Sequence, residues 1–182
     1  MEKIYLVRHC KADGQQPKAQ LTEEGRQQAQ DLIPFFEEYP IDLIMASTYD
    51  RAVQTAEPIA ASRDLPIHEE KRLTERVFST LKVDDWLTWM QRGFVEMDLE
   101  FEGGESGRAA QERIVEVMNE LIERPEEAAV VVSHGNLISM FLQTINDQFS
   151  FEDWQKMTNP DVFLITRDEA TKEFQYERIF TK

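Results

Sequence analysis

Two short apolar runs, far apart in the chain, each lead to a histidine, and this pattern constrains the fold more than any other feature. Residues 4–7 read Ile-Tyr-Leu-Val and are followed directly by Arg8 and His9. Residues 129–132 read Ala-Val-Val-Val and reach His134 after one serine. Continuous apolar runs of this length are typical of strands buried on both faces of a parallel sheet. Because ligands of open α/β sheets bind beyond the carboxyl ends of the strands, we expect both histidines at a binding site.

The rest of the chain alternates between strand and helix patterns. Strands are expected at residues 3–7, 42–46, 66–69, 129–132, 162–166 and 173–180. Helices are expected at residues 23–38, 50–61, 83–97, 109–123 and 136–145. This alternation predicts a three-layer α/β/α sandwich with a mainly parallel sheet, and the last two strands are expected to form an antiparallel hairpin at its edge.

The length of the chain and a few local signals refine this fold. A chain of 182 residues, 41% of them hydrophobic, is long enough for one domain with its own core. We expect a single domain over residues 1–182, with a helical, cap-like insertion at about 76–107. Thr22 is the expected N-cap of the first helix. Pro34 and Pro58 lie inside predicted helices and are expected to kink or shorten them.

The formal net charge of −15 limits the expected partners. Nucleic acids and anionic membranes are bound by basic surfaces, so we expect neither as a partner. A small anionic substrate remains compatible, because a few clustered arginines can make a local positive cleft. The single cysteine excludes an internal disulfide, and the sequence shows neither a recognisable leader nor a membrane-spanning run. The expected location is therefore the cytoplasm.

A second arginine is expected at the same edge of the sheet. Residues 47–56 read Ser-Thr-Tyr-Asp-Arg-Ala-Val-Gln-Thr-Ala directly after a predicted strand, so Arg51 falls in the first turn of the next helix. Taken alone, Arg51 would be an ordinary solvated residue of a helix. Together with Arg8, His9 and His134, it predicts a cationic pocket with an imidazole nucleophile, which is typical of phosphate chemistry.

Six motifs then occur in a fixed order along the chain. They are Arg-His-Cys at 8–10, Leu-Thr-Glu-Glu-Gly at 21–25, the segment 47–56, Leu-Thr-Glu at 73–75, Gly-Glu-Ser at 104–106 and Ser-His-Gly at 133–135. In type and order they resemble the motifs of the histidine phosphatase superfamily, also called the phosphoglycerate mutase-like family. The resemblance covers nearly the whole chain. It implies that family's fold and an enzyme that hydrolyses a phosphate monoester, with a small phosphorylated molecule favoured over a phosphoprotein as substrate.

The resemblance also implies a role for each residue of the pocket. His9 would be the nucleophile and would form a phosphohistidine, while Arg8 and Arg51 would hold the phosphoryl oxygens. His134 would stabilise charge on the transferred group. Glu75 is the candidate general acid. Weaker substitutes for that role are Asp84, Asp85 and Glu105. This mechanism requires no metal and no other cofactor, and the three histidines lack the spacing of a zinc site.

The chain departs from the family pattern close to the nucleophile. Cys10 stands where the family has glycine, Ala12 where it has a small hydroxyl residue, and Gln15 where it has asparagine. Gln15 can still donate an amide hydrogen to a phosphate, so it remains a candidate for phosphate binding. The residues after Glu75 lack the Gly-x-Trp-Glu-Gly pattern of several branches of the family, so the resemblance does not name the substrate.

Three other functions remain open at this point. A phosphoglycerate mutase would transfer the phosphoryl group rather than release it, although a short chain leaves limited room for a lid that excludes water. A non-catalytic protein that binds phosphorylated ligands is compatible with the changes at Cys10 and Ala12. A cysteine phosphatase has a His-Cys-x5-Arg loop, and this chain carries Gln16 where that arginine is required.

The predicted helix over 83–97 carries several large apolar residues. Trp86 and Met90 share one face, so we expect them to pack the helix onto the body of the domain. Trp89 and Phe94 fall outside that face and are candidates for an apolar wall of the substrate site. We expect no role for His68, which lies on a predicted edge strand beside two glutamates.

Overall fold

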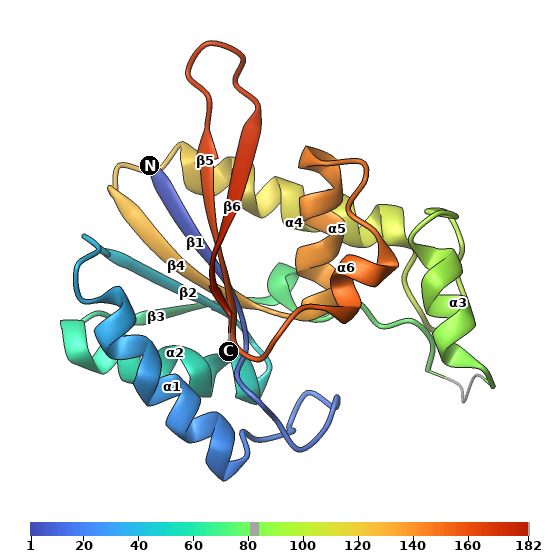
Figure 1. Ribbon diagram of the computed structural model, residues 1–182, viewed down its shortest axis with the longest axis horizontal. Helices are drawn as coiled ribbons and strands as arrows, with labels where there is room; N and C mark the ends of the chain where they lie inside the picture. The colour runs from blue at the N-terminus through green and yellow to red at the C-terminus, as the bar shows by residue number, and fades with distance from the viewer. Residues whose placement is uncertain (81–83, 182) are drawn as a thin grey trace.

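The computed structural model describes residues 1–80 and 84–181, and its central sheet lies between two groups of helices (Figure 1). The strands are β1 (Lys3–Arg8), β2 (Leu43–Ser47), β3 (Ile67–Glu70), β4 (Ala128–Ser133), β5 (Asp161–Arg167) and β6 (Phe174–Thr181). The helices are α1 (Glu23–Phe36), α2 (Asp50–Arg63), the single 3-10 turn η1 (Lys71–Leu73), α3 (Trp86–Gly93), α4 (Gly107–Ile122), α5 (Gly135–Ile145) and α6 (Phe151–Gln155).

The sheet has six strands in the order β3-β2-β4-β1-β5-β6. Strands β3, β2, β4 and β1 run parallel, whereas β5 is antiparallel to β1 and pairs with β6 in a hairpin. The mainly parallel sheet with an antiparallel edge is therefore confirmed. At the carboxyl ends, Arg8 pairs with Ser133, and Ala46 pairs with Val132. This register brings the ends of β1, β2 and β4 to one place.

Successive side chains of the central strands point to opposite faces of the sheet, and each face has its own core. On β1, Ile4 and Leu6 belong to the core shared with α4 and α5. Tyr5 and Val7 belong to the core shared with α1 and α2. All four side chains are fully buried. The two groups of helices on opposite faces make the expected three layers (Figure 1).

The observed ends of α1 and α2 test two expectations: that Thr22 caps α1, and that Pro34 and Pro58 kink or shorten their helices. Thr22 caps α1 as predicted, because its hydroxyl accepts the N–H of Gly25 at 3.0 Å. Helix α1 continues only two residues beyond Pro34, which agrees with the expected early end. Helix α2 continues five residues beyond Pro58, so the expected shortening there is wrong. Asp64, at a φ of 53°, ends α2 instead, and its N–H is donated to carbonyls of the last turn.

The segment between η1 and α4 differs most from the expectation. Helix α3 covers only Trp86–Gly93, and the predicted start of that helix at residue 83 lies outside the described residues. Phe94, just beyond α3, packs against Phe151 and Trp154 of α6. Helix α6 was not predicted, although Ser150 and Asp153 form a capping box at its start. Across the described residues, no helix is long and apolar enough to cross a membrane.

Candidate active site

The carboxyl ends of β1, β2 and β4 bring together the four cationic or imidazole residues that the sequence pointed to. The rings of His9 and His134 lie 5.1 Å apart, measured between their centroids. The N–H of His9 is donated to the carbonyl of Ser133, which ties the end of β1 to the end of β4. Arg51 reaches the same place from the first turn of α2, with its Nε 3.1 Å from Nε2 of His9. The expected convergence is therefore present.

The hydrogen bonds of His9 fix which ring nitrogen carries the proton. Nδ1 lies 2.7 Å from the carbonyl oxygen of Cys10, which can only accept, so Nδ1 donates. Nε2 is then left with a lone pair, which accepts the Nε–H of Arg51. Burial lowers the pKa of His9 to about 3, and the nearby charge of Arg51 acts in the same direction. The ring is therefore neutral near pH 7.

His134 is also neutral and is fully buried. Burial lowers its pKa well below the usual value, and His9 and Arg51 add to that effect. Its Nε2 lies 2.7 Å from the hydroxyl of Ser47, and its ring meets the ring of Tyr49 edge-on at 5.1 Å. Its Nδ1 is buried and has no hydrogen-bond partner among the described residues.

The two arginines are anchored by backbone carbonyls from distant segments. Nη1 of Arg51 donates to the carbonyl of Gln16, and Nη1 of Arg8 donates to the carbonyl of Met157, both at 2.9 Å. Nη2 of Arg51 and Nε of Arg8 are buried without a partner in the described chain. Burial lowers the pKa of both guanidiniums, while the negative charge of Glu75 opposes that shift. Both remain charged, because arginine is not deprotonated in proteins.

The close approach of α5 to Arg8 depends on a glycine. A Cβ built on Gly135 would lie 2.9 Å from Nε and 3.0 Å from Cζ of Arg8. Real Cβ atoms are not found at such distances from a guanidinium, so a larger residue at position 135 would displace Arg8 or the first turn of α5. The Ser-His-Gly motif thus has glycine at position 135 because a side chain there would collide with Arg8.

The two arginines and His134 thus each have a buried nitrogen without a partner in the described chain: Nε of Arg8, Nη2 of Arg51 and Nδ1 of His134. Buried polar atoms in proteins are almost always hydrogen-bonded, so a group of unpaired ones indicates a place for a ligand. Two of these atoms belong to guanidiniums. The arrangement can bind an anion with several acceptor oxygens, as a phosphoryl group has.

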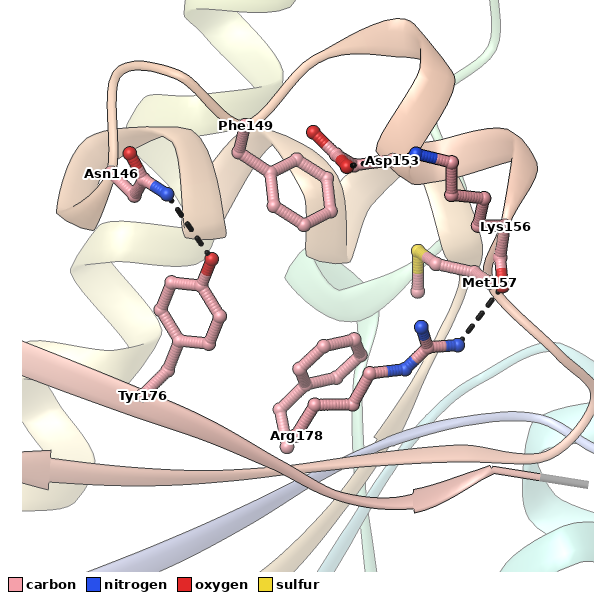
Figure 2. A pocket seen from close by; sticks show the side chains of 8 residues that line it. Asn146, Phe149, Asp153, Lys156, Met157, Tyr176 and Arg178 are labelled. Carbon is pink, nitrogen blue, oxygen red and sulfur yellow. Dashed lines mark hydrogen bonds and ion pairs between the residues drawn. The ribbon is translucent and has the colours of Figure 1, made fainter.

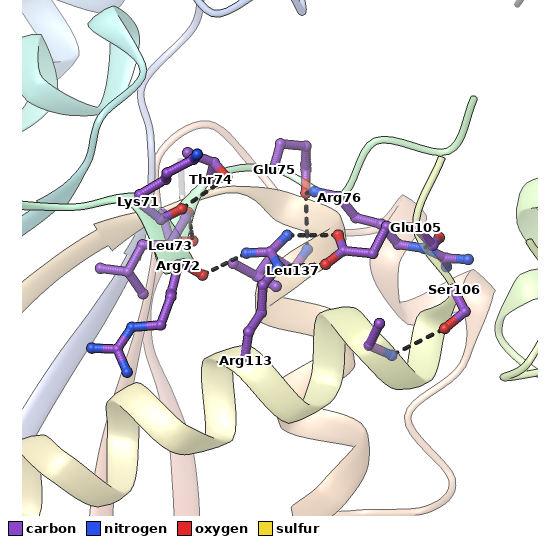
Figure 3. Close-up of polar contacts among 12 residues, drawn as sticks. Lys71, Arg72, Leu73, Thr74, Glu75, Arg76, Glu105, Ser106, Arg113 and Leu137 are labelled. Atoms are coloured by element: carbon purple, nitrogen blue, oxygen red, sulfur yellow. Dashed lines mark hydrogen bonds and ion pairs between the residues drawn. The ribbon is translucent and has the colours of Figure 1, made fainter. Parts of the chain in front are cut away.

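Glu75 belongs to a segment without regular secondary structure that follows η1, and its side chain contacts the start of α5. Its carboxylate accepts the N–H groups of Arg76 and Leu137, both at 2.9 Å, and that of Asn136 at 3.1 Å. Figure 3 shows Glu75 reaching towards the first turn of α5, where Leu137 lies. Because α5 begins directly after His134, these bonds place the carboxylate close to the two histidines.

The segment that carries Glu75 is held from outside by an ion pair (Figure 3). Arg113 of α4 donates to both carboxylate oxygens of Glu105, at 2.6 and 2.8 Å, and also to the carbonyl of Arg72. The backbone of Glu105 in turn accepts from Nε of Arg76 at 3.0 Å and donates to the carbonyl of Val77 at 2.8 Å. The pair thus fixes the chain on both sides of Glu75.

Arg8, His9 and Glu75 open into a cavity of about 490 Å³, whereas Arg51 and His134 are fully buried and do not line it. Its polar lining includes Arg8, His9, Gln15, Tyr49, Glu75 and Asn136. Its apolar lining includes Val77, Phe78, Trp86, Met90 and Trp154. The cavity thus joins the polar residues around His9 to a group of apolar side chains, among which Arg76 and Ser79 also line it.

A smaller cavity of about 270 Å³ lies between α6 and β6 (Figure 2). Several of its polar groups already have partners. Nη2 of Arg178 donates to the carbonyl of Lys156 at 3.0 Å and also pairs with Asp161, while Asn146 bonds the hydroxyl of Tyr176. This cavity brings no histidine and no unpaired arginine together, so the larger cavity is the candidate active site.

Comparisons with known proteins agree with this geometry. The sequence profile of the histidine phosphatase superfamily (branch 1) matches residues 4–179. The chain belongs to this superfamily. The search of curated protein sequences found no match to this histidine phosphatase homologue.

Solved structures share its fold. The mycobacterial glucosyl-3-phosphoglycerate phosphatase, in complex with VO3, is 19% identical, with a TM-score of 0.78 over 100% of this chain and 99% of that chain. A mutant phosphoserine phosphatase from Entamoeba histolytica, in complex with phosphoserine, is 20% identical, with a TM-score of 0.78 over 98% and 96%. YhfR from Bacillus stearothermophilus is 24% identical, with a TM-score of 0.78 over 97% and 95%. At these identities the likeness establishes the fold.

In this histidine phosphatase homologue, two expectations about α3 are wrong. Trp86 does not pack the helix onto the body but is 52% exposed and lines the cavity. Trp89 and Phe94 do not line it, because Trp89 stacks on Arg92 and Phe94 turns towards α6 beyond the end of the helix. Met90 is buried as predicted and also borders the cavity.

The candidate substitutes for Glu75 lie elsewhere. Glu105 is tied to Arg113, and Asp84 and Asp85 are exposed before α3 and do not line the cavity. Gln15 does border the cavity, with its side chain exposed to solvent. In the described part of the chain, no three His, Cys, Asp or Glu side chains are grouped as metal ligands.

Sequence reasoning missed two residues that support the site. Nδ2 of Asn159 donates to the carbonyl of His9 at 2.6 Å, across 150 positions of the chain. Thr55 accepts the N–H of Cys10 at 3.0 Å. Thr55 lies in the segment 47–56, one of the motifs on which the resemblance rests. That motif could therefore have identified Thr55 as a residue of the site. Nothing in the sequence signals the contact made by Asn159.

Proposed function

We propose that this protein is a phosphatase that hydrolyses a phosphate monoester through a phosphohistidine on His9. The observation that carries the proposal is the state of that ring. Burial keeps it neutral, the carbonyl of Cys10 holds the proton on Nδ1, and Nε2 has a lone pair beside Arg51, while Arg8, Arg51 and His134 each have a buried nitrogen without a partner. A neutral imidazole facing an anion site is a nucleophile in position for phosphorus.

Substrate binding follows from the unpaired donors. The phosphoryl oxygens accept from Nε of Arg8, from Nη2 of Arg51 and from His134. The Nε–H of Arg51, which bonds Nε2 of His9 in the free enzyme, turns to a phosphoryl oxygen and frees the lone pair. Ser47 donates its hydroxyl hydrogen to Nε2 of His134, so that Nδ1 of that ring carries the hydrogen and donates a hydrogen bond to the phosphoryl group. Gln15 adds an amide donor at the rim.

In the first chemical step, Nε2 of His9 attacks phosphorus as the bond from phosphorus to the alcohol oxygen breaks. Glu75 serves as the general acid and gives a proton to the leaving oxygen. The ring becomes a phosphorylated imidazolium, and the carbonyl of Cys10 stabilises its positive charge through the Nδ1–H bond.

In the second step, water attacks phosphorus and the bond to His9 breaks. The carboxylate of Glu75 takes a proton from that water, which regenerates the acid and leaves inorganic phosphate. The cavity supports access of water, because Trp86 at its mouth is half exposed. Residues 76–107 act in this proposal as a cap over the alcohol side of the site.

The compared structures support hydrolysis of a small phosphorylated molecule. Two of those proteins are named as phosphatases of such molecules, glucosyl-3-phosphoglycerate and phosphoserine. We place the reaction in the cytoplasm, as the sequence suggests.

The direct test is phosphate release from a panel of monoesters that includes p-nitrophenyl phosphate, with His9→Gln as the control for contaminating phosphatases. We expect release by the native protein and none by the variant. Interconversion of phosphoglycerates without release would identify a mutase. Tight binding of inorganic phosphate with no turnover of any ester would identify a non-catalytic binder, and either result would overturn the proposal.

A further inference from the structure

We propose that the alcohol side of the cavity is a subsite for an uncharged apolar group, so that the preferred substrates are monoesters of aromatic or extended alkyl alcohols. The inference rests on the proposed phosphatase function and deepens it. It comes from two properties of the cavity beyond His9: the apolar side chains that line it, and the packing of Arg76, the second cation of the described lining, against Phe78 and α3.

The apolar wall is assembled from three separate parts of the chain. Val77 and Phe78 come from the segment after Glu75, Trp86 from α3 and Trp154 from α6. Trp86 is 52% exposed and Val77 is 40% exposed, and they are two of only four large apolar side chains that are exposed in the described structure. Single exposed apolar side chains are common on protein surfaces and need no explanation. A group of them lining one cavity indicates a ligand site.

The charges around the cavity do not favour a substrate with a second anionic group. Of the described lining residues, only Arg8 and Arg76 are cationic at pH 7, and Arg8 belongs to the phosphate end. Nη1 and Nη2 of Arg76 are buried and have no hydrogen-bond partner among the described residues, like Nε of Arg8, but the guanidinium lies over the ring of Phe78 at 5.6 Å. Asp84 and Asp85, both exposed just before Trp86, would repel a carboxylate entering there.

The position of Arg76 is fixed by its neighbours. Its Nε donates to the carbonyl of Glu105 at 3.0 Å, and a Cβ built on Gly93 would lie 3.3 Å from Nη1. The guanidinium is therefore packed against α3. The guanidinium, held by these contacts, forms part of the cavity wall.

Three primary esters with the same reacting group test the proposal. They are propyl phosphate, phenylpropyl phosphate with the ring on the terminal carbon, and the phosphate ester of β-hydroxypropionate. Burial of the phenyl group is expected to raise kcat/KM about 10- to 100-fold over propyl phosphate. The carboxylated ester is expected to be no better than propyl phosphate. A carboxylated ester that reacts faster than the phenylpropyl ester would overturn the proposal and would indicate that Arg76 turns into the cavity.

Two neighbouring variants locate the effect. Trp86→Ala is expected to lower kcat/KM for phenylpropyl phosphate roughly tenfold and to change that for propyl phosphate by no more than about twofold. Leu87→Ala is the matched control, because Leu87 is the next residue of α3, is 42% exposed and does not line the cavity. The proposal fails if the two variants act alike, or if Trp86→Ala slows both esters equally.

A binding experiment separates this inference from the proposed chemistry. Phenylpropylphosphonate and propylphosphonate cannot be hydrolysed, and their affinities are measured by calorimetry without any turnover. We expect the phenylpropyl compound to bind about 10- to 100-fold more tightly. If no ester is hydrolysed but this difference is found, the phosphatase function is wrong and the apolar subsite stands. If esters are hydrolysed but the two phosphonates bind equally, the function stands and the subsite is wrong.

Discussion

The two ends of the cavity are built in different ways. At the phosphate end, His9, Arg51 and His134 directly follow strands or open a helix, and all three are buried. At the alcohol end, Glu75 and the residues up to 79 have no regular secondary structure, and Trp86 lies on a short helix away from the sheet (Figure 1). The ends of the strands position the first end, whereas backbone N–H groups at the start of α5 and the ion pair between Arg113 and Glu105 hold the second.

This difference suggests that the two ends can be changed separately. Substitutions at the phosphate end should slow the reaction of every ester by the same factor, because all substrates share the phosphoryl group. Substitutions at the alcohol end should discriminate between esters, because they alter contacts with the group that leaves. The following predictions test this separation, from the largest expected effect to the smallest.

Loss of the nucleophile is expected to have the largest effect. His9→Gln should lower kcat by about 10⁴-fold or more for every ester, including p-nitrophenyl phosphate with its good leaving group. Cys10→Ser should retain most of the activity, because the contact between the two residues uses the Cys10 carbonyl and not its thiol. The opposite pattern, with His9→Gln active and Cys10→Ser inactive, would make the cysteine the nucleophile.

Loss of one phosphate-binding donor group should be the next largest effect. Arg8→Met removes a guanidinium with an unpaired buried nitrogen and is expected to lower kcat/KM by about 10²- to 10³-fold. Arg8→Lys should recover part of this loss, because it restores the charge but not the forked geometry. The measurement is kcat/KM for aryl and alkyl esters in parallel. A loss confined to one class of ester would contradict the claim that all substrates bind through the same phosphate end.

At the alcohol end, Arg113→Met should release the segment that carries Glu75. For alkyl esters, which need a proton on the leaving oxygen, we expect kcat to fall by about 10²-fold. For p-nitrophenyl phosphate, which leaves readily as an anion, the change should stay within about threefold, since little general acid catalysis is required. The expected cause of the lower kcat is that the Glu75 carboxylate is no longer held in one position. Substrate affinity is not expected to change, so KM should change little.

The matched control for Arg113 lies on the same helix. Arg108 forms an ion pair with Asp98 on the exposed surface, and this pair does not involve the segment that carries Glu75. Arg108→Met should leave both kinds of ester at the native rate. If Arg113→Met slows alkyl and p-nitrophenyl esters equally, its effect is a general loss of structure and the positioning of Glu75 is not its role.

The buried imidazoles predict a pH dependence of stability, which is the smallest of these effects. In the unfolded chain His9 titrates near 6.5, whereas burial lowers its pKa to about 3 in the folded protein. Below pH 6.5 the unfolded state therefore binds a proton that the folded state does not, and stability falls as the pH falls. From pH 8 to pH 5 this group should cost about 2 kcal/mol.

Denaturant unfolding of the ligand-free protein in buffer without phosphate measures this cost. Between pH 8 and pH 5, His9→Gln should lose about 2 kcal/mol less than the native protein. Equal losses in the two proteins would show that the folded state does not hold His9 neutral, and would remove the basis of the nucleophile assignment.

The same difference between the two ends explains how much the sequence could predict. Arg8, His9 and His134 were found because apolar runs identify buried strands, and the carboxyl ends of parallel strands meet at one edge of the sheet. Arg51 followed from its place in the first turn after β2. Local periodicity was enough for these residues, because the backbone of the sheet positions them.

The alcohol end could not be found by the same reasoning. Glu75 came from the resemblance alone, since an irregular segment has no periodicity to place a side chain. Phe94 was assigned to the wrong side because the predicted helix was too long, and a helical face does not extend past Gly93. Trp86 is the first residue of α3, where the chain is exposed, so sharing a face with the buried Met90 did not bury it. Trp154 lies on a five-residue helix that only the capping box at Ser150 could have signalled.

The most direct test of the account is to identify the phosphorylated atom. The enzyme is mixed with p-nitrophenyl phosphate, quenched within one turnover in alkaline denaturant, which preserves nitrogen–phosphorus bonds, and analysed by peptide mass spectrometry and phosphorus NMR. The account predicts one phosphoryl group, on Nε2 of His9, because Nδ1 is held by the carbonyl of Cys10. Turnover with no phosphorylated enzyme, or a phosphoryl group on Nδ1 of His9, on His134 or on the Cys10 thiol, would contradict it.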